Sequence, residues 1–427
     1  MLFMTGDRDK QRGKVVERLI ADLSSMFFMK DFVFRNPSYV TSGQEREVTD
    51  LMFVLNQDCM IVSVKGTDGR DKTAVRLPLW ARKKVWEASK NAKTALQRVA
   101  KLEIKAKNLW DETRTFAAGT LHPICGLALV ECSQEMFAPI IFAVKQPASS
   151  APPIHFLSAN DFLNVVTLLG SIWDVFRYFK LRQNVSHAFD GINQERPLLC
   201  YYTLRSHQDF SGFLNEDKEH LRQLHQLFLL DTLSKYRERD RLSNWVNSVI
   251  QQLHNRSENL DSYVPPELKH MVEAGNARTA YLGMAAMLNS LPMSNKAWIG
   301  QQIEDGIQRA KATGQSSCFF YKQLRKDVVF VFAVFTEFNR TEKLRALNSF
   351  LPAAQYKTGL GEALGIGIDA NDENMGFELI WRRGPIDNSG PVRALAAQLF
   401  SSPIETLCPT PFGEPRAYSP KEQDSTL

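Results

Sequence analysis

The sequence lacks several features that would place it at once in a familiar class of protein. Its six cysteines include no CxxC pair, and only Cys125 and Cys132 lie close together, so we expect reduced thiols and no zinc cluster. The early charges at the N-terminus exclude the apolar core of a secretory signal. The longest apolar runs are less than half of what a membrane span needs. We therefore expect a cytoplasmic protein with no membrane partner.

Catalytic motifs with a fixed spacing are missing as well. The sequence contains no HExxH pair, no GK[ST] phosphate loop, no GxSxG elbow and no kinase signature. The histidines show no metal-ligand spacing, so core or surface roles are expected for them. These absences exclude the common zinc proteases, P-loop ATPases and serine hydrolases.

The composition that remains is typical of a globular protein. Hydrophobic residues make up 44% of the chain and charged residues 23%, which excludes a disordered or fibrous class. Of 52 Lys and Arg residues, 23 fall in residues 1–145, against 17 of the 47 Asp and Glu residues. The positive excess thus lies wholly in the first third, which indicates a polyanionic partner for that region.

Hydrophobic periodicity divides the chain into successive regions. We expect an α/β domain at residues 1–145, a linker at 146–157, a helical domain at 158–315, a small α+β domain at 316–412 and a flexible tail at 413–427. Beyond the first domain, helices are predicted at residues 159–182, 215–254, 266–289, 295–312 and 341–350, and strands at 318–321, 328–336, 363–368 and 376–381.

Chemistry is concentrated in the first domain. Residues 12–29 form an amphipathic helix, with Glu17 just beyond the edge of its apolar stripe. Residues 47–55 and 59–65 form two strands joined by a tight turn. Whether the turn is made by residues 57–58 or 56–57, Asp50 and Lys65 converge on one side of the hairpin. A salt bridge would explain an Asp in an apolar strand. A phosphodiester-cleaving site explains it too, because Mg²⁺ prefers carboxylate oxygens and a lysine can assist the attacking water.

This run of residues resembles the PD-(D/E)XK (restriction-endonuclease-like) nuclease superfamily. The resemblance covers roughly residues 10–140 and depends on Glu17 on the first helix, Asp50 on one strand and Ser63-Val64-Lys65 on the next. It implies an αβββαβ fold and a metal-dependent nuclease. Glu17 and Asp50 would bind Mg²⁺ or Mn²⁺, Lys65 would assist the water, and Ser63 would have a secondary role.

One position departs from the family pattern. Ser63 stands where an Asp or Glu usually lies two residues before the lysine, and Glu47 and Asp68 are the nearest acidic substitutes. With fewer charges to hold a metal, a catalytically degenerate protein that binds nucleic acid or acts as a scaffold is the alternative.

A basic segment follows the hairpin. Residues 82–107 carry nine basic residues against Glu87 and Glu103, with apolar residues at helical spacing. We predict a helix that contacts DNA or RNA phosphates through Lys83, Lys84, Lys90, Lys93, Arg98 and Lys101, although a solvated face would have the same composition. Two further strands are predicted at residues 126–131 and 140–144.

The sequence therefore predicts a DNA endonuclease that is regulated by a partner protein or by self-association. A role in prokaryotic defence against foreign DNA is expected by analogy only. A third hypothesis is an unrelated enzyme within residues 154–400.

Overall fold

A computed structural model describes most of the chain, with gaps. The described residues are 4–28, 30–67, 76–132, 140–141, 152–185, 191–192, 195–204, 210, 213, 223, 226, 233–258, 274–323, 328–372, 376–399 and 406–407. The chain divides into two compact units, Met1–Tyr236 and Arg237–Leu427. The predicted tail at 413–427 and most of the predicted helix before residue 233 lie outside the described residues.

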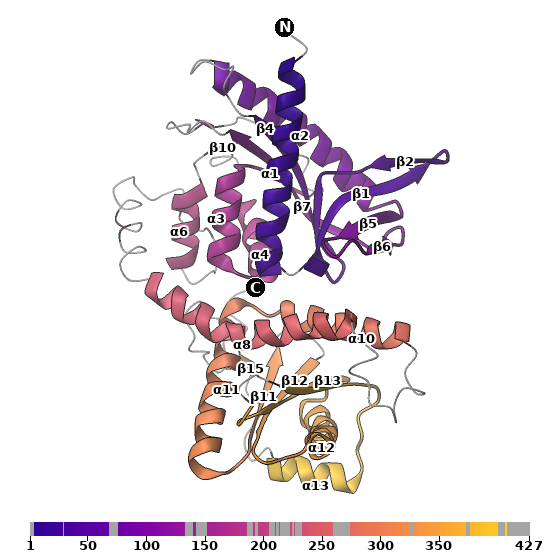
Figure 1. Cartoon of the computed structure of the whole chain (residues 1–427), viewed down its shortest axis with the longest axis vertical. Helices are drawn as coiled ribbons and strands as arrows, with labels where there is room; N and C mark the ends of the chain where they lie inside the picture. The colour runs from indigo at the N-terminus through magenta and orange to yellow at the C-terminus, as the bar shows by residue number, and fades with distance from the viewer. Residues whose placement is uncertain are drawn as a thin grey trace. The chain divides into compact units, whose positions relative to one another are not determined.

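The first unit is built on an eight-stranded mixed sheet (Figure 1). Its strands are β1 (Val33–Thr41), β2 (Gln44–Glu47), β3 (Leu51–Leu55), β4 (Asp58–Thr67), β5 (Ile104–Asn108), β6 (Thr113–Phe116), β7 (His122–Cys132) and β9 (Ile154–Ser158). The order is β6-β5-β1-β3-β4-β7-β9, with β2 paired to β1. β1, β3 and β4 are antiparallel, whereas β7 runs parallel to β4 and β9 parallel to β7. The short β8 (Ile140–Ile141) and β10 (Gly191–Ile192) pair only with each other.

Helices cover both faces of this sheet. On one face, α2 (Arg76–Val99) buries Ala81, Val85, Ala88 and Ala92 in a cluster that includes Cys59 and Ile61 of β4. On the other, α1 (Met4–Phe28) packs on β4 and α3 (Ala159–Leu169), whose Phe162 stacks on Phe53 of β3. α4 (Ile172–Arg182) and α6 (Glu195–Leu204) complete the described helices of this unit. The sheet is therefore enclosed between helical layers, as expected for an α/β fold with parallel strand pairs.

The apolar stripe predicted for the first helix is partly wrong. Val16 and Ile20 are buried, but Val15, Leu19 and Met26 are exposed. Gly13 of this helix lies against Gly66 of β4, so this part of the helix packs closely on the strand. Glu17, about one turn further along, is half-buried.

Two predicted element boundaries in the first unit are also wrong. The strand predicted at residues 47–55 is interrupted between β2 and β3, because β1 pairs with both and the chain bulges between them. The helix predicted through residue 107 ends at Val99, since Ile104–Asn108 alternates buried and exposed side chains and pairs with β1 as β5. Lys101 therefore follows the helix rather than lying on it.

The region predicted as a linker and helical domain is divided between the two compact units, with residues up to Tyr236 in the first and Arg237 onward in the second. β9 overlaps the end of the predicted linker and adds a buried strand to the sheet. The helix predicted at residues 159–182 is two helices, because Gly170 adopts φ 71° as the C-cap of α3 and Ser171 caps the N-terminus of α4. The elements from β9 to α6 therefore belong to the compact unit that contains this sheet.

Polar side chains that sequence periodicity would place on an exposed face are buried in α3 and α4. Asp161, Asp174 and Arg182 are all enclosed, so an exposed position is wrong for each. Asp174 accepts from the capping Ser171 hydroxyl at 2.6 Å. Arg182 donates to both carboxylate oxygens of Glu195 on α6, at 2.8 and 3.0 Å, and Tyr178 donates to the same carboxylate. Burial of the Arg182 and Glu195 charges is tolerated because they form an ion pair.

The second unit has a smaller sheet flanked by helices. Its strands are β11 (Ser317–Gln323), β12 (Val328–Phe335), β13 (Glu362–Asp369), β14 (Phe377–Arg383) and β15 (Thr406–Leu407), in the order β14-β13-β12-β11-β15. The described helices are α8 (Leu233–Glu258), α10 (Ala274–Asn289), α11 (Met293–Thr313), α12 (Arg340–Thr358) and α13 (Gly390–Leu399). α12 connects the parallel strands β12 and β13 and packs on both. The predicted strands here correspond closely to the observed ones.

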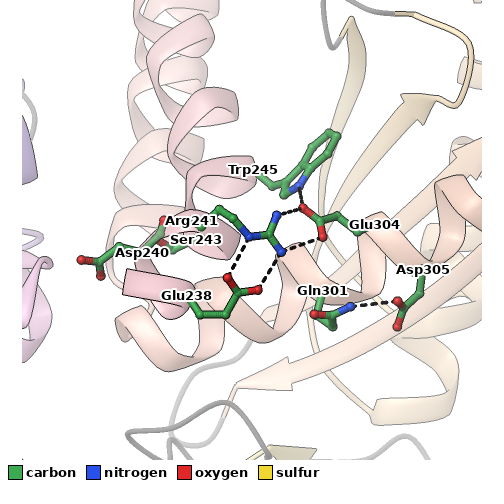
Figure 2. Close-up of polar contacts among 8 residues, drawn as sticks. All are labelled: Glu238, Asp240, Arg241, Ser243, Trp245, Gln301, Glu304 and Asp305. Atoms are coloured by element: carbon green, nitrogen blue, oxygen red, sulfur yellow. Dashed lines mark hydrogen bonds and ion pairs between the residues drawn. The ribbon is translucent and has the colours of Figure 1, made fainter. Parts of the chain in front are cut away.

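Helices α8 and α11 are joined by polar contacts and by close backbone packing. Figure 2 shows Arg241 of α8 between Glu238 on its own helix and Glu304 of α11, with hydrogen bonds of 2.6 to 3.0 Å. Trp245 donates to Glu304 as well, at 2.9 Å. The backbones approach so closely that a Cβ on Gly300 would lie 1.9 Å from the Leu242 carbonyl oxygen. Because the charged groups are largely solvent-exposed, packing contributes more to this contact than the ion pairs do.

No helix in the described parts of the chain is long and apolar enough to cross a membrane.

Candidate active site

A cavity of about 1020 Å³ lies where α1, α2 and the β3–β4 hairpin meet. Its acidic side chains are Glu17, Glu47, Asp50 and Glu87, and its basic ones are Lys14, Arg18, Arg35, Lys65 and Lys84. Gln11, Gly13, Asn36, Val64 and Gly66 complete the lining. The structure thus brings Glu17, Asp50 and Lys65, which the sequence places on three separate elements, into one cavity.

A β-bulge places Asp50. Between the pairs Arg35–Leu51 and Ser38–Glu47, residues 36–37 of β1 lie opposite residues 48–50, which connect β2 and β3. The Asn36 N–H donates to the Asp50 carbonyl at 3.0 Å, so the backbone stays paired while the strand bends. Bulges commonly redirect side chains beside functional sites. Here the bulge allows Glu47 and Asp50 to line the same cavity.

The carboxylate of Asp50 is held in place by β4. Its Oδ2 accepts from the Val64 N–H at 2.6 Å and from the Ser63 hydroxyl at 3.2 Å. Leu55 pairs with Asp58 and Leu51 with Val62, so residues 56–57 make the turn and Asp50 comes opposite Ser63. Within the described residues, no ion pair joins Asp50 to Lys65, so the salt-bridge alternative is not supported.

Ser63 is a positioning residue in this arrangement. Its side chain is only 1% exposed, and its hydroxyl donates to Asp50. Lys65 lies two residues further along β4, on the same face of the strand, and is half-buried in the cavity wall. Of the acidic substitutes for the residue at position 63, Glu47 lines the cavity and Asp68 lies outside the described residues.

Burial and neighbouring carboxylates change the protonation of Glu17 in the cavity. Burial, followed by the charges of Asp50 and Glu47, raises the pKa of Glu17 to about 7 against the opposing effect of Arg35 and Lys14. Burial and Asp50 also raise the pKa of Glu47. A bound cation would weaken the repulsion between these carboxylates.

Glu17→Gln is expected to change how stability depends on pH. Because the folded-state pKa of Glu17 lies above its usual value of 4.5, the folded protein binds the extra proton and loses stability as pH rises from 4.5 through about 7. The variant should match wild type at pH 4 and be more stable at pH 8, by on the order of 1 kcal/mol after solvent screening. Urea unfolding at pH 4 and pH 8 measures this difference in stability, and Asp22→Asn on the exposed side of α1 is the control. An equal difference at both values would contradict the prediction.

Close packing of α1 on β4 places Glu17. A Cβ on Gly66 would lie 3.1 Å from the Cα and N of Gly13 and 3.2 Å from the carbonyl carbon of Arg12, all of them backbone atoms. A Cβ on Gly13 would meet only the Gly66 N at 3.9 Å. The packing therefore leaves little room for a side chain on the strand and ordinary room for one on the helix.

This asymmetry predicts different outcomes for two matched substitutions. Gly66→Ala must displace α1 and should destabilise the protein by about 1–3 kcal/mol. Gly13→Ala should be neutral or stabilise it by about 0.5–1 kcal/mol, because alanine favours a helix. Chemical denaturation of the two variants compares them directly. Equal effects from both would show that the backbones do not pack in this way.

The basic residues predicted to contact nucleic acid occupy different positions on and after α2. Lys83, Lys90 and Lys93 are exposed. Lys84 lines the cavity and bonds to Glu87 at 2.6 Å. Arg98 lies over the Tyr39 ring at 4.9 Å, and Lys101 follows the helix.

Three basic cavity residues were missed by the sequence reasoning. Lys14 lies three residues before Glu17 and four before Arg18. At these spacings side chains are neighbours on a helix, so the sequence could have placed Lys14 beside both residues. Arg35 lies at the bulge of β1, a position without a local sequence signal.

The cavity is thus lined by both carboxylates and basic side chains. Across the described residues, no group of three or more His, Cys, Asp or Glu side chains is placed to hold a metal ion together. Mg²⁺ commonly uses one or two carboxylates with water and substrate phosphates, and Glu17 and Asp50 both line the cavity. No protein-family model matches this sequence, and no curated protein matches it.

Proposed function

We propose that this protein is a metal-dependent nuclease that hydrolyses phosphodiester bonds in DNA. The observation that carries the proposal is that Glu17, Asp50 and Lys65 line one cavity together with several basic side chains. The order of elements supports it: α1, β1, β3, β4, α2 and β7 have the order αβββαβ, with β2 added between β1 and β3 and the β5–β6 hairpin added before β7. This is the order that the resemblance to the PD-(D/E)XK superfamily implies.

Each charged group has a distinct part in this proposal. Glu17 and Asp50 would hold a divalent cation, which supplies Lewis-acid activation and charge neutralisation when bound. Ser63 and the Val64 N–H orient Asp50. Lys65 orients the attacking water and offsets charge on the scissile phosphate. The basic residues Lys14, Arg18, Arg35 and Lys84 attract the phosphates on either side.

A second candidate is a nucleic-acid-binding protein without catalysis. Ser63 favours it, because a buried hydroxyl stands where a further carboxylate would strengthen metal binding. Glu47 opposes it, because this carboxylate lines the same cavity and its pKa is also raised by burial and by Asp50.

Cleavage by the full chain tests the proposal. Supercoiled plasmid, single-stranded DNA and RNA are incubated with Mg²⁺, with Mn²⁺ or with EDTA. We expect strand breaks in DNA that require the metal. Binding of nucleic acid without cutting under all of these conditions would favour the non-catalytic candidate.

A further inference from the structure

The outer face of α2 combines an aromatic side chain with a row of lysines. Leu79, Lys83, Trp86, Lys90 and Lys93 follow one another at steps of four and three residues, so they form one stripe along the helix. All five are exposed, and Trp86 is 63% exposed. The stripe is about 21 Å long at the rise of an α-helix.

The charge on this stripe has one sign. The only acidic residue of residues 79–99 is Glu87, which lines the cavity and pairs with Lys84. Lys90 Nζ lies 5.7 Å from the centre of the Trp86 ring, near the outer limit of a cation–π contact. The stripe therefore presents a partly exposed indole among cations, which complements a polyanion that also carries flat aromatic groups.

This chemistry distinguishes between partners. An apolar protein surface would need continuous apolar area, but Lys83 lies between Leu79 and Trp86. A DNA duplex presents phosphates while its bases are already stacked, so the indole would gain little from it. Unpaired nucleotides offer both phosphates and free base faces, and aromatic side chains among basic residues are how proteins bind them.

The stripe also borders the cavity. Glu87, which lines the cavity and pairs with Lys84, is four residues after Lys83 and three before Lys90, so it lies beside the stripe on the helix surface. A strand that leaves the cavity at this point would meet Lys83 and Trp86. We infer that this face binds single-stranded nucleic acid next to the cavity, with a base stacked on Trp86 and phosphates on Lys83, Lys90 and Lys93. The inference rests on the proposed function for its class of ligand.

Binding in EDTA tests this without any need for catalysis. Fluorescence anisotropy of the full chain is measured with a labelled oligothymidylate and with a labelled DNA duplex of equal length. Trp86→Ala should weaken binding of the single strand at least about fivefold, the lower range for one stacked base, and change duplex binding by less than about twofold. Trp86→Phe should retain most of the affinity, and Leu79→Ala should behave as wild type.

The lysines provide an independent comparison. Lys83→Ala and Lys93→Ala should each weaken binding of both ligands and lower the salt slope by about one for each phosphate that is no longer bound. Equal effects on both ligands from Trp86→Ala, or no effect on either, would overturn the inference. Self-association that Trp86→Ala abolishes, with single-strand binding unchanged, would assign the face to a second copy and overturn it too.

The outcome separates this inference from the proposed function. Trp86-dependent binding with no metal-dependent cutting would retain the stripe as a binding face and reject the nuclease. Metal-dependent cutting without a Trp86 effect on single-strand binding would reject the stripe alone.

Discussion

Asp50→Asn and Lys65→Ala are each expected to reduce metal-dependent cleavage of DNA by about 100-fold or more, the range for loss of one acid–base or charge-stabilising group. The Asn variant retains an oxygen that can accept from the Val64 N–H, so it removes the charge but keeps the hydrogen bond. Asp50→Ala should be as inactive and also less stable, because the buried N–H of Val64 is then left without an acceptor. Gel electrophoresis of nicked plasmid measures the activity.

Two controls give this prediction its specificity. Lys93→Ala removes an exposed lysine outside the cavity, so it should lower affinity for DNA and leave the cleavage rate at saturating substrate unchanged. Circular dichroism of Asp50→Asn should match wild type. If cutting survives both Asp50→Asn and Lys65→Ala, the chemistry lies elsewhere, and an enzyme within residues 154–400 becomes the leading hypothesis.

Glu195→Gln is expected to destabilise the protein by about 3–5 kcal/mol, because it leaves Arg182 as a buried charge without its carboxylate. The side chains of Arg182 and Glu195 are 0% and 2% exposed, and the Arg182 guanidinium donates through Nε and Nη2. Burial and the Glu195 charge both hold the pKa of Tyr178 well above its usual value, so Tyr178 stays a donor to this carboxylate. Guanidinium unfolding followed by far-ultraviolet circular dichroism measures the change in stability.

An exposed ion pair provides the matched comparison. Glu238→Gln removes a partner of Arg241 at the surface and should change stability by at most about 1 kcal/mol. The double variant Arg182→Met with Glu195→Leu should recover much of the stability that Glu195→Gln removes, since a buried ion pair can be replaced by apolar packing. If the double variant were less stable than Glu195→Gln alone, the unpaired charge of Arg182 would not be the cause of the instability of Glu195→Gln.

The parts of the site that were predictable are those set by local periodicity. The alternating strands around residues 56–57 place Asp50 and Lys65 on one side of the hairpin. This follows from the spacing of residues along two adjacent elements. The chemistry of these residues was inferred from their types and from the resemblance, and it stays a prediction.

The remaining features depend on partners far along the chain. The bulge at Asp50 arises because β1 pairs with two strands, and the position of Glu17 depends on the close approach of Gly13 and Gly66. The burial of Arg182 depends on Glu195, which lies on a different helix. Hydrophobic periodicity carries no information about such pairings.

Some signals were present in the sequence and were overlooked. Gly170-Ser171 is a helix end followed by a helix start, and Ile104–Asn108 has the two-residue alternation of a strand. These signals divide residues 159–182 into two helices and end the basic helix before Lys101.

The parallel pairing of β4, β7 and β9 has a consequence for how the chain folds during synthesis. Glu17, Asp50 and Lys65 are all synthesised before β7 and β9. β4, which carries Lys65 and bonds to Asp50, pairs with β7, which begins at His122, and β7 in turn pairs with β9 near residue 154. Such non-local parallel pairing forms slowly. A nascent chain released at residue 145 would expose the unpaired edge of β7, which is prone to aggregation. The candidate catalytic side chains are therefore synthesised before the strands that complete the sheet around them.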